Sequence, residues 1–182
     1  MFLPFFCYNI VMKKIVIFVC NGNIHRSVIA AQCFIDVLKK NKLSSRFIVD
    51  SYGLQGTQGT APPKHKRLSD YPKEWEAANP TLQKLNIDIS NHKFQKITAN
   101  IIKKAGIVIA MDNKVYSGKK NSLTKQFPNQ TKKIHAFSEL TSHNKYIKDP
   151  VKSSDKKLHK KIIKSIYSTL NKNYKIILTW IK

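Results

Sequence analysis

The feature that most constrains the fold is a strand-like segment followed at once by a polar loop and a helix-like segment. Five consecutive apolar residues, Ile15 to Val19, suit a central parallel strand that is covered on both faces. After a short loop, residues 28–38 are largely apolar and contain no Gly or Pro. The pattern predicts a helix from Ser27 to about Lys40, which Asn41 ends.

The loop between these two segments has the residue types of an anion site. The first N–H groups of a helix lack partners and carry the positive end of the helix dipole. Gly22 and Asn23 tolerate the positive φ that a tight loop needs. At the loop entrance Cys20 can be held as a thiolate, and the planar fork of Arg26 can bind two phosphate oxygens. The sequence therefore predicts that these groups converge on one tetrahedral anion.

The alternative for this loop is a buried cysteine and a surface arginine that have no joint role. The chain contains only three arginines, Arg26, Arg46 and Arg67, and otherwise uses lysine as its cation. A chance Cys-x5-Arg-Ser pattern is therefore less frequent here than in an average sequence. Its position at a strand-to-helix junction also favours the anion site.

Residues 19–27, VCNGNIHRS, resemble the phosphate-binding loop of the low-molecular-weight protein tyrosine phosphatases. That family hydrolyses phosphotyrosine through a phosphocysteine intermediate, and the resemblance extends over nearly all of the chain after Met12. It implies a single α/β domain in residues 13–182: a four-stranded parallel sheet with helices on both faces, the phosphotyrosine phosphatase I-like fold. Residues 1–12 are then an N-terminal extension. The resemblance implies Cys20 as the nucleophile and a phosphate-binding set of Asn21, Gly22, Asn23, Ile24, His25, Arg26 and Ser27.

A second motif, Asp149-Pro150, precedes the last helical segment. By itself an Asp-Pro pair is typical of a plain turn. The family carries its general acid in such a pair, which implies that Asp149 protonates the leaving oxygen and then activates water. Val151-Lys152 stand where the family often has two tyrosines that are sites of regulatory phosphorylation, so that regulation is not expected here.

The resemblance also implies residues that support the loop: Asn23, Ser27, Ser51 and His92. Ser51 ends a predicted strand, 46–51, and would hold the strained Asn23 through its hydroxyl, as would His92 through its ring. Without the resemblance, Ser51 could equally bond its own turn, and His92 could simply be exposed.

The remaining segments complete an alternating α/β pattern. Residues 53–80 hold most of the Gly and Pro and form a long loop, in which Tyr71 and Trp75 either wall the phosphate site or pack on the body. Asn79-Pro80 predicts a helix start, and Thr98 caps a helix that ends at Ala105. Strands are expected at 107–111 and 132–136. Asp112 is expected as a helix cap and a possible site residue, and an amphipathic helix is expected over 155–181.

Composition limits the partners. The formal charge of +23 suits a nucleic acid, a membrane surface or an anionic substrate. Because the lysines are scattered through every segment and form no basic stripe interleaved with aromatic residues, we expect a solvated surface and no specific nucleic acid. No membrane span and no signal peptide are predicted, and three widely spaced cysteines predict neither a metal site nor a disulfide framework. We expect a cytoplasmic monomer or weak dimer without cofactor, acting on a tyrosine-phosphorylated protein or a small aryl phosphate.

Two rival functions share the loop. Thioredoxin-coupled arsenate reductases need two further cysteines near the strand that ends at Met111, and none lies between Cys33 and Lys182. A non-catalytic phosphate-binding module is the other rival, against which the retained Cys20, Arg26 and Asp149 argue.

His25 stands where the family usually has a second cysteine that can protect the nucleophile in a disulfide. A protonated His25 could favour the thiolate, or its side chain could point outward. Because His25 cannot form the disulfide, we expect mild peroxide to abolish activity without a loop disulfide appearing. Mass spectrometry of the oxidised protein checks this, and a link from Cys20 to Cys33 or Cys7 would contradict it.

Overall fold

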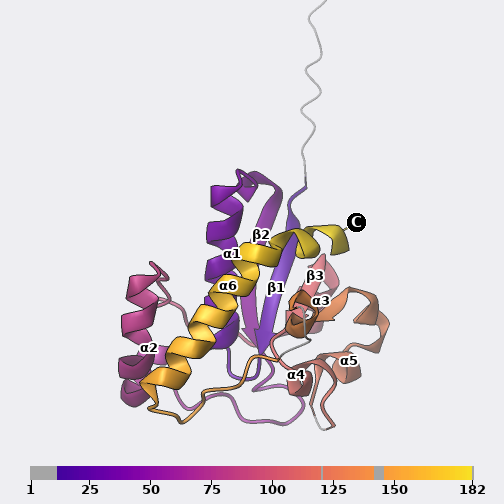
Figure 1. Cartoon of the computed structure of the whole chain (residues 1–182). Coiled ribbons are helices and arrows are strands. Elements are labelled where there is room, and N and C mark those ends of the chain that lie inside the picture. Colours follow the sequence, from indigo (N-terminus) through magenta and orange to yellow (C-terminus); the bar gives the residue numbers. More distant parts are fainter. Residues whose placement is uncertain (1–11, 120, 142–145, 182) are drawn as a thin grey trace, which may run out of the picture.

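A computed structural model describes residues 12–119, 121–141 and 146–181. Cys7 and nearly all of the expected N-terminal extension lie outside them. Within the described residues, a four-stranded sheet runs through the centre of the molecule (Figure 1). Its strands, all parallel, are β1 (Lys14–Cys20), β2 (Phe47–Gly53), β3 (Ile107–Ala110) and β4 (Ile134–Ala136), in the order β2-β1-β3-β4. The predicted parallel sheet is confirmed, with β1 inside it.

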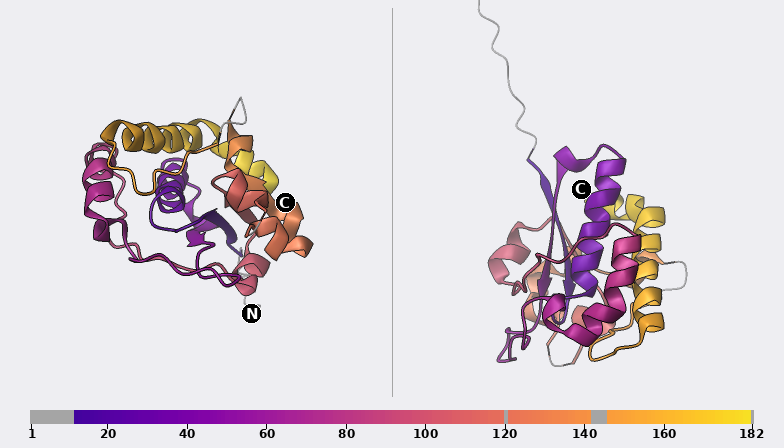
Figure 2. Two further views of the ribbon diagram at one scale, coloured as in Figure 1. Left: turned by 90° about the horizontal axis from the view of Figure 1, so that it is seen from below. Right: turned by 90° about the vertical axis from the view of Figure 1, so that its left-hand side faces the viewer.

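Helices cover both faces of this sheet. α1 (Arg26–Lys40), α2 (Pro72–Lys84) and α6 (Lys156–Trp180) lie on one face, and α3 (Ala99–Lys104), α4 (Asn113–Ser117) and α5 (Leu123–Gln126) lie on the other (Figures 1 and 2). Short 3-10 turns, η1 (Ser44–Arg46), η2 (Leu68–Asp70), η3 (Pro128–Lys133) and η4 (Phe137–Leu140), complete the connections.

Strand β1 is apolar throughout its centre because it is buried on both sides. Val16 and Phe18 belong to the hydrophobic cluster under α1 and α6, whereas Ile17 and Val19 belong to the cluster under α3 and α4. All four side chains are fully buried. Successive residues of a strand point to opposite faces, so a strand covered on both faces needs apolar residues at every position.

Most helix ends agree with the sequence. The side chain of Thr98 accepts a hydrogen bond from Ile101 N (3.3 Å) at the start of α3, and that of Asp112 accepts one from Val115 N (2.9 Å) at the start of α4. Asp155 caps α6 in the same way. α1 begins at Arg26, one residue before the predicted start, and Asn41 ends it as expected.

The predicted helix start at Asn79-Pro80 is wrong. Helix α2 begins at Pro72, where a missing N–H costs nothing, and Pro80 lies inside the helix. The helix continues past this proline because Ala77, Ala78 and Leu82 are buried against the core. The long loop therefore ends at Tyr71 instead of at residue 80, and it includes the turn η2.

Helix α6 is amphipathic, as predicted. Leu170 and Ile166 are fully buried, whereas Lys156, Lys157, Lys160, Lys161 and Lys164 are exposed. No helix in the described part of the chain is long and apolar enough to cross a membrane.

Replacing Leu170 by Ala should lower the free energy of unfolding by about 2–5 kcal/mol, because the core of α6 loses a fully buried side chain. Urea denaturation measures this loss. Lys164→Ala on the exposed face is the matched control and should change the free energy by less than about 0.5 kcal/mol. A loss in Leu170→Ala no larger than in the control would contradict the packing described here.

Candidate active site

The predicted phosphate loop leaves the carboxyl end of β1 and enters α1 at Arg26. It borders a cavity of about 320 Å³. The other walls come from distant parts of the chain: residues 62–64, Tyr71, Glu74, residues 149–152 and His159. The parallel sheet thus places the loop at its carboxyl edge, where open α/β sheets bind ligands.

Cys20 lies at the floor of the loop, and two groups contact its sulfur. The backbone N–H of Asn23 donates to Sγ over 3.2 Å, and the hydroxyl of Ser27 lies 3.1 Å from Sγ. The side-chain amide of Asn23 donates to Ser27 Oγ over 3.2 Å, so the Ser27 hydroxyl can direct its own proton to the sulfur. Both contacts and the N-terminus of α1 stabilise a thiolate at this position.

Asn23 organises the loop from a buried position. Its φ is 47°, which is uncommon for a residue with a side chain, and its Nδ2 donates to Ser51 Oγ over 2.9 Å. Its Oδ1 accepts from the backbone N–H of Gln95 (2.8 Å), and His92 Nε2 lies 3.1 Å from both oxygens of Asn23. The structure therefore brings the four predicted support residues together around one amide. Gln95 was missed, since a backbone N–H has no signature in the sequence.

The end of β2 presses against the same loop. Leu54 N donates to Cys20 O (3.1 Å) and Gln55 N to Asn21 O (2.9 Å). A Cβ at Gly53 would lie 2.9 Å from Asn21 O and 3.0 Å from the Cβ of Asn23. Only glycine fits this contact without displacing the loop backbone.

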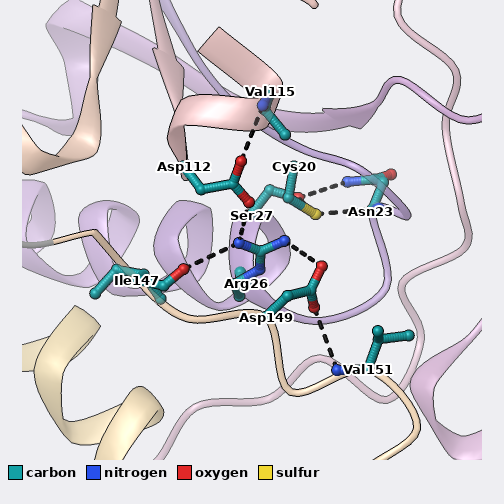
Figure 3. Close-up of polar contacts among 9 residues, drawn as sticks. All are labelled: Cys20, Asn23, Arg26, Ser27, Asp112, Val115, Ile147, Asp149 and Val151. Carbon is teal, nitrogen blue, oxygen red and sulfur yellow. Dashed lines mark hydrogen bonds and ion pairs between the residues drawn. The ribbon is translucent and has the colours of Figure 1, made fainter. Parts of the chain in front are cut away.

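Arg26 joins the loop to two other segments. Its guanidinium is buried, pairs with the carboxylates of Asp112 and Asp149, and donates from Nη1 to Ile147 O over 3.0 Å (Figure 3). Burial by itself lowers the pKa of Arg26, but the negative charges of Cys20, Asp149 and Asp112 outweigh it and raise that pKa above its usual value. Arg26 is therefore charged, and it is held in one orientation.

The two carboxylates differ in exposure. Asp112, at the end of β3, accepts from Val115 N through one oxygen and pairs with Arg26 through the other, so the expected cap is also a site residue. Only 17% of its side chain is exposed, against 40% for Asp149. Asp149 borders the cavity beside Cys20, and its Oδ1 accepts from Val151 N over 3.3 Å. Of the two, Asp149 is better placed to exchange protons with a bound molecule.

The side chain of His25 is neither protonated nor directed outward, so both alternatives for its orientation and charge are wrong. Its ring is buried against His159 of α6, with Nε2 3.1 Å from Nδ1 of His159. Burial, together with the nearby His159 and Arg26, lowers the pKa of His25 to about 3. The imidazole is thus neutral and directed inward, and it supplies no positive charge for Cys20. His159 was not predicted as a site residue, because within the helical pattern it occupies an ordinary core position.

The aromatic residues of the long loop have different places. Tyr71 borders the cavity, and its hydroxyl is held by the backbone of His65, accepting from N (3.0 Å) and donating to O (3.3 Å). Trp75 instead packs on the hydrophobic cluster under α1 and α6.

Cys33 is buried in the same cluster, and burial raises its pKa to about 12, so it is an inert core thiol. The described residues contain no group of three or more His, Cys, Asp or Glu side chains that could hold a metal ion.

Replacing Asn23 separates backbone strain from hydrogen bonding. Asn23→Ala should lose the bonds to Ser27, Ser51, His92 and Gln95 and also keep an unfavourable φ, whereas Asn23→Gly loses only the bonds. We expect the alanine variant to be less stable than the glycine variant by about 1 kcal/mol in urea denaturation. Both variants should bind inorganic phosphate more weakly than wild type in calorimetry. Equal stability of the two variants would show that the loop does not need the positive φ.

Comparison with known proteins gives one family. Residues 15–178 match the family described as low molecular weight phosphotyrosine protein phosphatase. The comparison with curated proteins finds no match.

Several solved structures share the fold. A YwlE mutant from Bacillus subtilis is 23% identical with a TM-score of 0.72, and the alignment covers 91% of this chain and 99% of that chain. A low molecular weight protein tyrosine phosphatase from T. tengcongensis is 26% identical with a TM-score of 0.68, covering 90% and 99%. The YwlE arginine phosphatase from Geobacillus stearothermophilus is 19% identical with a TM-score of 0.69, covering 91% and 94%. Because the family match covers residues 15–178, from β1 through the loop to α6, this chain belongs to the low molecular weight phosphotyrosine protein phosphatase family and is a phosphatase.

Proposed function

We propose that the protein hydrolyses phosphotyrosine-type phosphomonoesters through a phosphocysteine intermediate, with Cys20, Arg26 and Asp149 as its catalytic residues. One observation carries the proposal. A cysteine sulfur with two hydrogen-bonding neighbours, a buried charged arginine and a half-exposed carboxylate border the same cavity. Nucleophilic displacement at phosphorus requires these three kinds of group.

The phosphoryl group binds among the N–H groups of residues 21–26, at the N-terminus of the 15-residue helix α1. Its oxygens compete with Asp149 for Arg26, because both are anions that fit the same guanidinium fork. Asp112 stays on the other side of Arg26 and keeps the guanidinium in place. Binding therefore frees the carboxyl of Asp149 for the leaving oxygen.

The reaction proceeds in two displacements. The Cys20 thiolate attacks phosphorus and forms the S–P bond while the P–O bond to the phenol breaks, and Asp149 gives its proton to the departing oxygen. Asp149, now a carboxylate, then removes a proton from the water that attacks the phosphocysteine. The S–P bond breaks and inorganic phosphate and the thiolate are released. Arg26 and the loop N–H groups stabilise the charge on the equatorial oxygens in both steps.

The walls of the cavity support an aromatic ester as substrate. Ile24, Pro62, Pro63, Leu68 and Tyr71 border it and provide apolar contact for a flat ring. Lys64 and Lys152 border it too and favour an anionic ligand. A tyrosine-phosphorylated protein or a small aryl phosphate meets both requirements.

The proposed phosphatase domain comprises residues 13–182, with residues 1–12 as an extension outside it. Two observations support this boundary: β1 begins at Lys14, and Met12 is 83% exposed. A monomer or weak dimer and a cytoplasmic location stay predictions.

Cys20→Ser should abolish turnover of p-nitrophenyl phosphate and of a phosphotyrosine peptide, because a hydroxyl at this position is a far weaker nucleophile than a thiolate. Asp149→Ala should lower kcat/KM on the peptide about 10²- to 10⁴-fold through loss of the general acid. Lys164→Ala, on the exposed face of α6, serves as the unaffected control. Steady-state kinetics measures these changes, and rapid acid quench of wild type should trap phosphate on Cys20.

Retained turnover in Cys20→Ser would overturn the mechanism. The substrate class is tested on the same enzyme with a phosphoarginine peptide, because some proteins of this fold are arginine phosphatases. A higher kcat/KM for phosphoarginine than for phosphotyrosine would contradict the proposed substrate while leaving the nucleophile in place.

A further inference from the structure

A chain of hydrogen bonds in the wall of the cavity joins its two functional loops. Nε2 of His25, in the phosphate loop, lies 3.1 Å from Nδ1 of His159, and Nε2 of His159 lies 2.9 Å from Ser153 O. Both rings are buried, and they meet edge to face with centroids 5.1 Å apart. Ser153 belongs to the segment that follows Asp149, so the chain connects the phosphate loop to the segment of the proposed acid.

The positions of the hydrogens follow from the end of this chain. A backbone carbonyl only accepts, so Nε2 of His159 must carry a hydrogen and donate it to Ser153. In a neutral His159 the other nitrogen, Nδ1, is then an acceptor, which receives the Nε2–H of His25. The Nδ1 of His25 is buried and has no partner among the described residues, which agrees with a neutral ring that carries no hydrogen there.

The segment that Ser153 ends is a tight turn. Ser153 N donates to Pro150 O over 3.0 Å, and Val151 N donates to Asp149 Oδ1. Lys152 has a φ of 61°, which costs energy for a residue with a side chain. Contacts outside the turn can offset this cost.

Two sets of contacts hold this turn from opposite sides. Arg26 contacts Ile147 O and Asp149 on the cavity side (Figure 3), and His159 contacts Ser153 O on the side of α6. In the proposed reaction the phosphoryl group competes for Arg26, so the arginine contact to Asp149 is lost when the acid is needed. The contact with His159 involves no group that binds the phosphoryl oxygens, and it can persist throughout the reaction.

We propose that His159 is a positioning residue, which holds the Asp149 turn over the phosphate loop through Ser153 while the substrate occupies Arg26. His25 keeps the ring of His159 in the required tautomer. This inference rests on the proposed function, in which Asp149 protonates the leaving oxygen.

Two variants of nearly equal polarity separate positioning from packing. In His159→Gln the amide nitrogen reaches the place of Nε2 and can still donate to Ser153 O, whereas in His159→Asn the side chain is one carbon shorter and reaches only the place of Nδ1.

The readout is the ratio of kcat/KM for p-nitrophenyl phosphate to that for phenyl phosphate. Phenolate needs the proton of the acid far more than nitrophenolate does, so the ratio rises when the acid is displaced. Partial unfolding of a variant cancels in such a ratio.

Asp149→Ala should raise this ratio about 100-fold or more, as expected for loss of a general acid. His159→Asn should raise it about 10-fold, in line with the cost of a small misplacement. His159→Gln should stay within about twofold of wild type, because it keeps the bond to Ser153. An increase in Asp149→Ala without one in His159→Asn would overturn the inference and leave the proposed function intact, as would equal increases in the two His159 variants. No increase in Asp149→Ala would overturn both.

Imidazole ¹⁵N spectra of the wild-type protein provide a test that does not depend on activity. We expect the rings of both His25 and His159 to carry their hydrogen on Nε2, as the contacts with His159 Nδ1 and Ser153 O require. A His159 ring with its hydrogen on Nδ1 would overturn the proposed chain.

Discussion

The structure of the site depends on the burial of one guanidinium. A charge removed from water must be paired with opposite charge, and Arg26 is 1% exposed at the first residue of α1. It therefore draws Asp112 from the end of β3 and Asp149 from the segment before α6 to the same point. The pairing fixes where these segments lie relative to the phosphate loop. Because two carboxylates meet one guanidinium here, a phosphate dianion can pair with Arg26 only when Asp149 gives up its place.

The buried side-chain amide of Asn23 is likewise fully hydrogen-bonded. The amide of Asn23 meets two hydroxyls, a histidine and a backbone N–H, and this compensates for a backbone conformation that asparagine adopts at some cost. The loop is thus held in one conformation before any ligand arrives, which in the proposed function limits the reorganisation that phosphate binding needs. Gly53 serves the same end, because its missing side chain lets β2 close against the loop.

His25 shows how one substitution in a loop can be accommodated far away. A bulky imidazole at this position has to be buried, and it finds its partner in His159 on the last helix, 134 residues further along the chain. Burial keeps the pKa of His25 near 3, so its ring adds no charge next to Arg26. His159 also contacts Ser153 in the segment that follows Asp149, and in the proposed function this links the phosphate loop to the placement of the acid.

The sequence by itself determined the features that depend on neighbouring residues along the chain. Burial of the centre of β1, the strand-loop-helix order around Cys20, and the caps Thr98 and Asp112 all follow from periodicity and from the side chains next to each helix start. The resemblance of the loop to a known family added the support residues around Asn23, which lie 28 and 69 positions away as Ser51 and His92.

Only the tertiary structure decided the contacts that depend on how distant segments meet. Four features leave no local trace in the sequence: the pairing of Asp112 with Arg26, the partner of His25, the contact of the Gln95 N–H, and the separate places of Tyr71 and Trp75. The start of α2 belongs to this group, because Pro72 and Pro80 both suit a first turn and only burial of Ala77 and Ala78 selects the earlier one. Such choices depend on the free energy of packing across the whole core, which no short stretch of sequence contains.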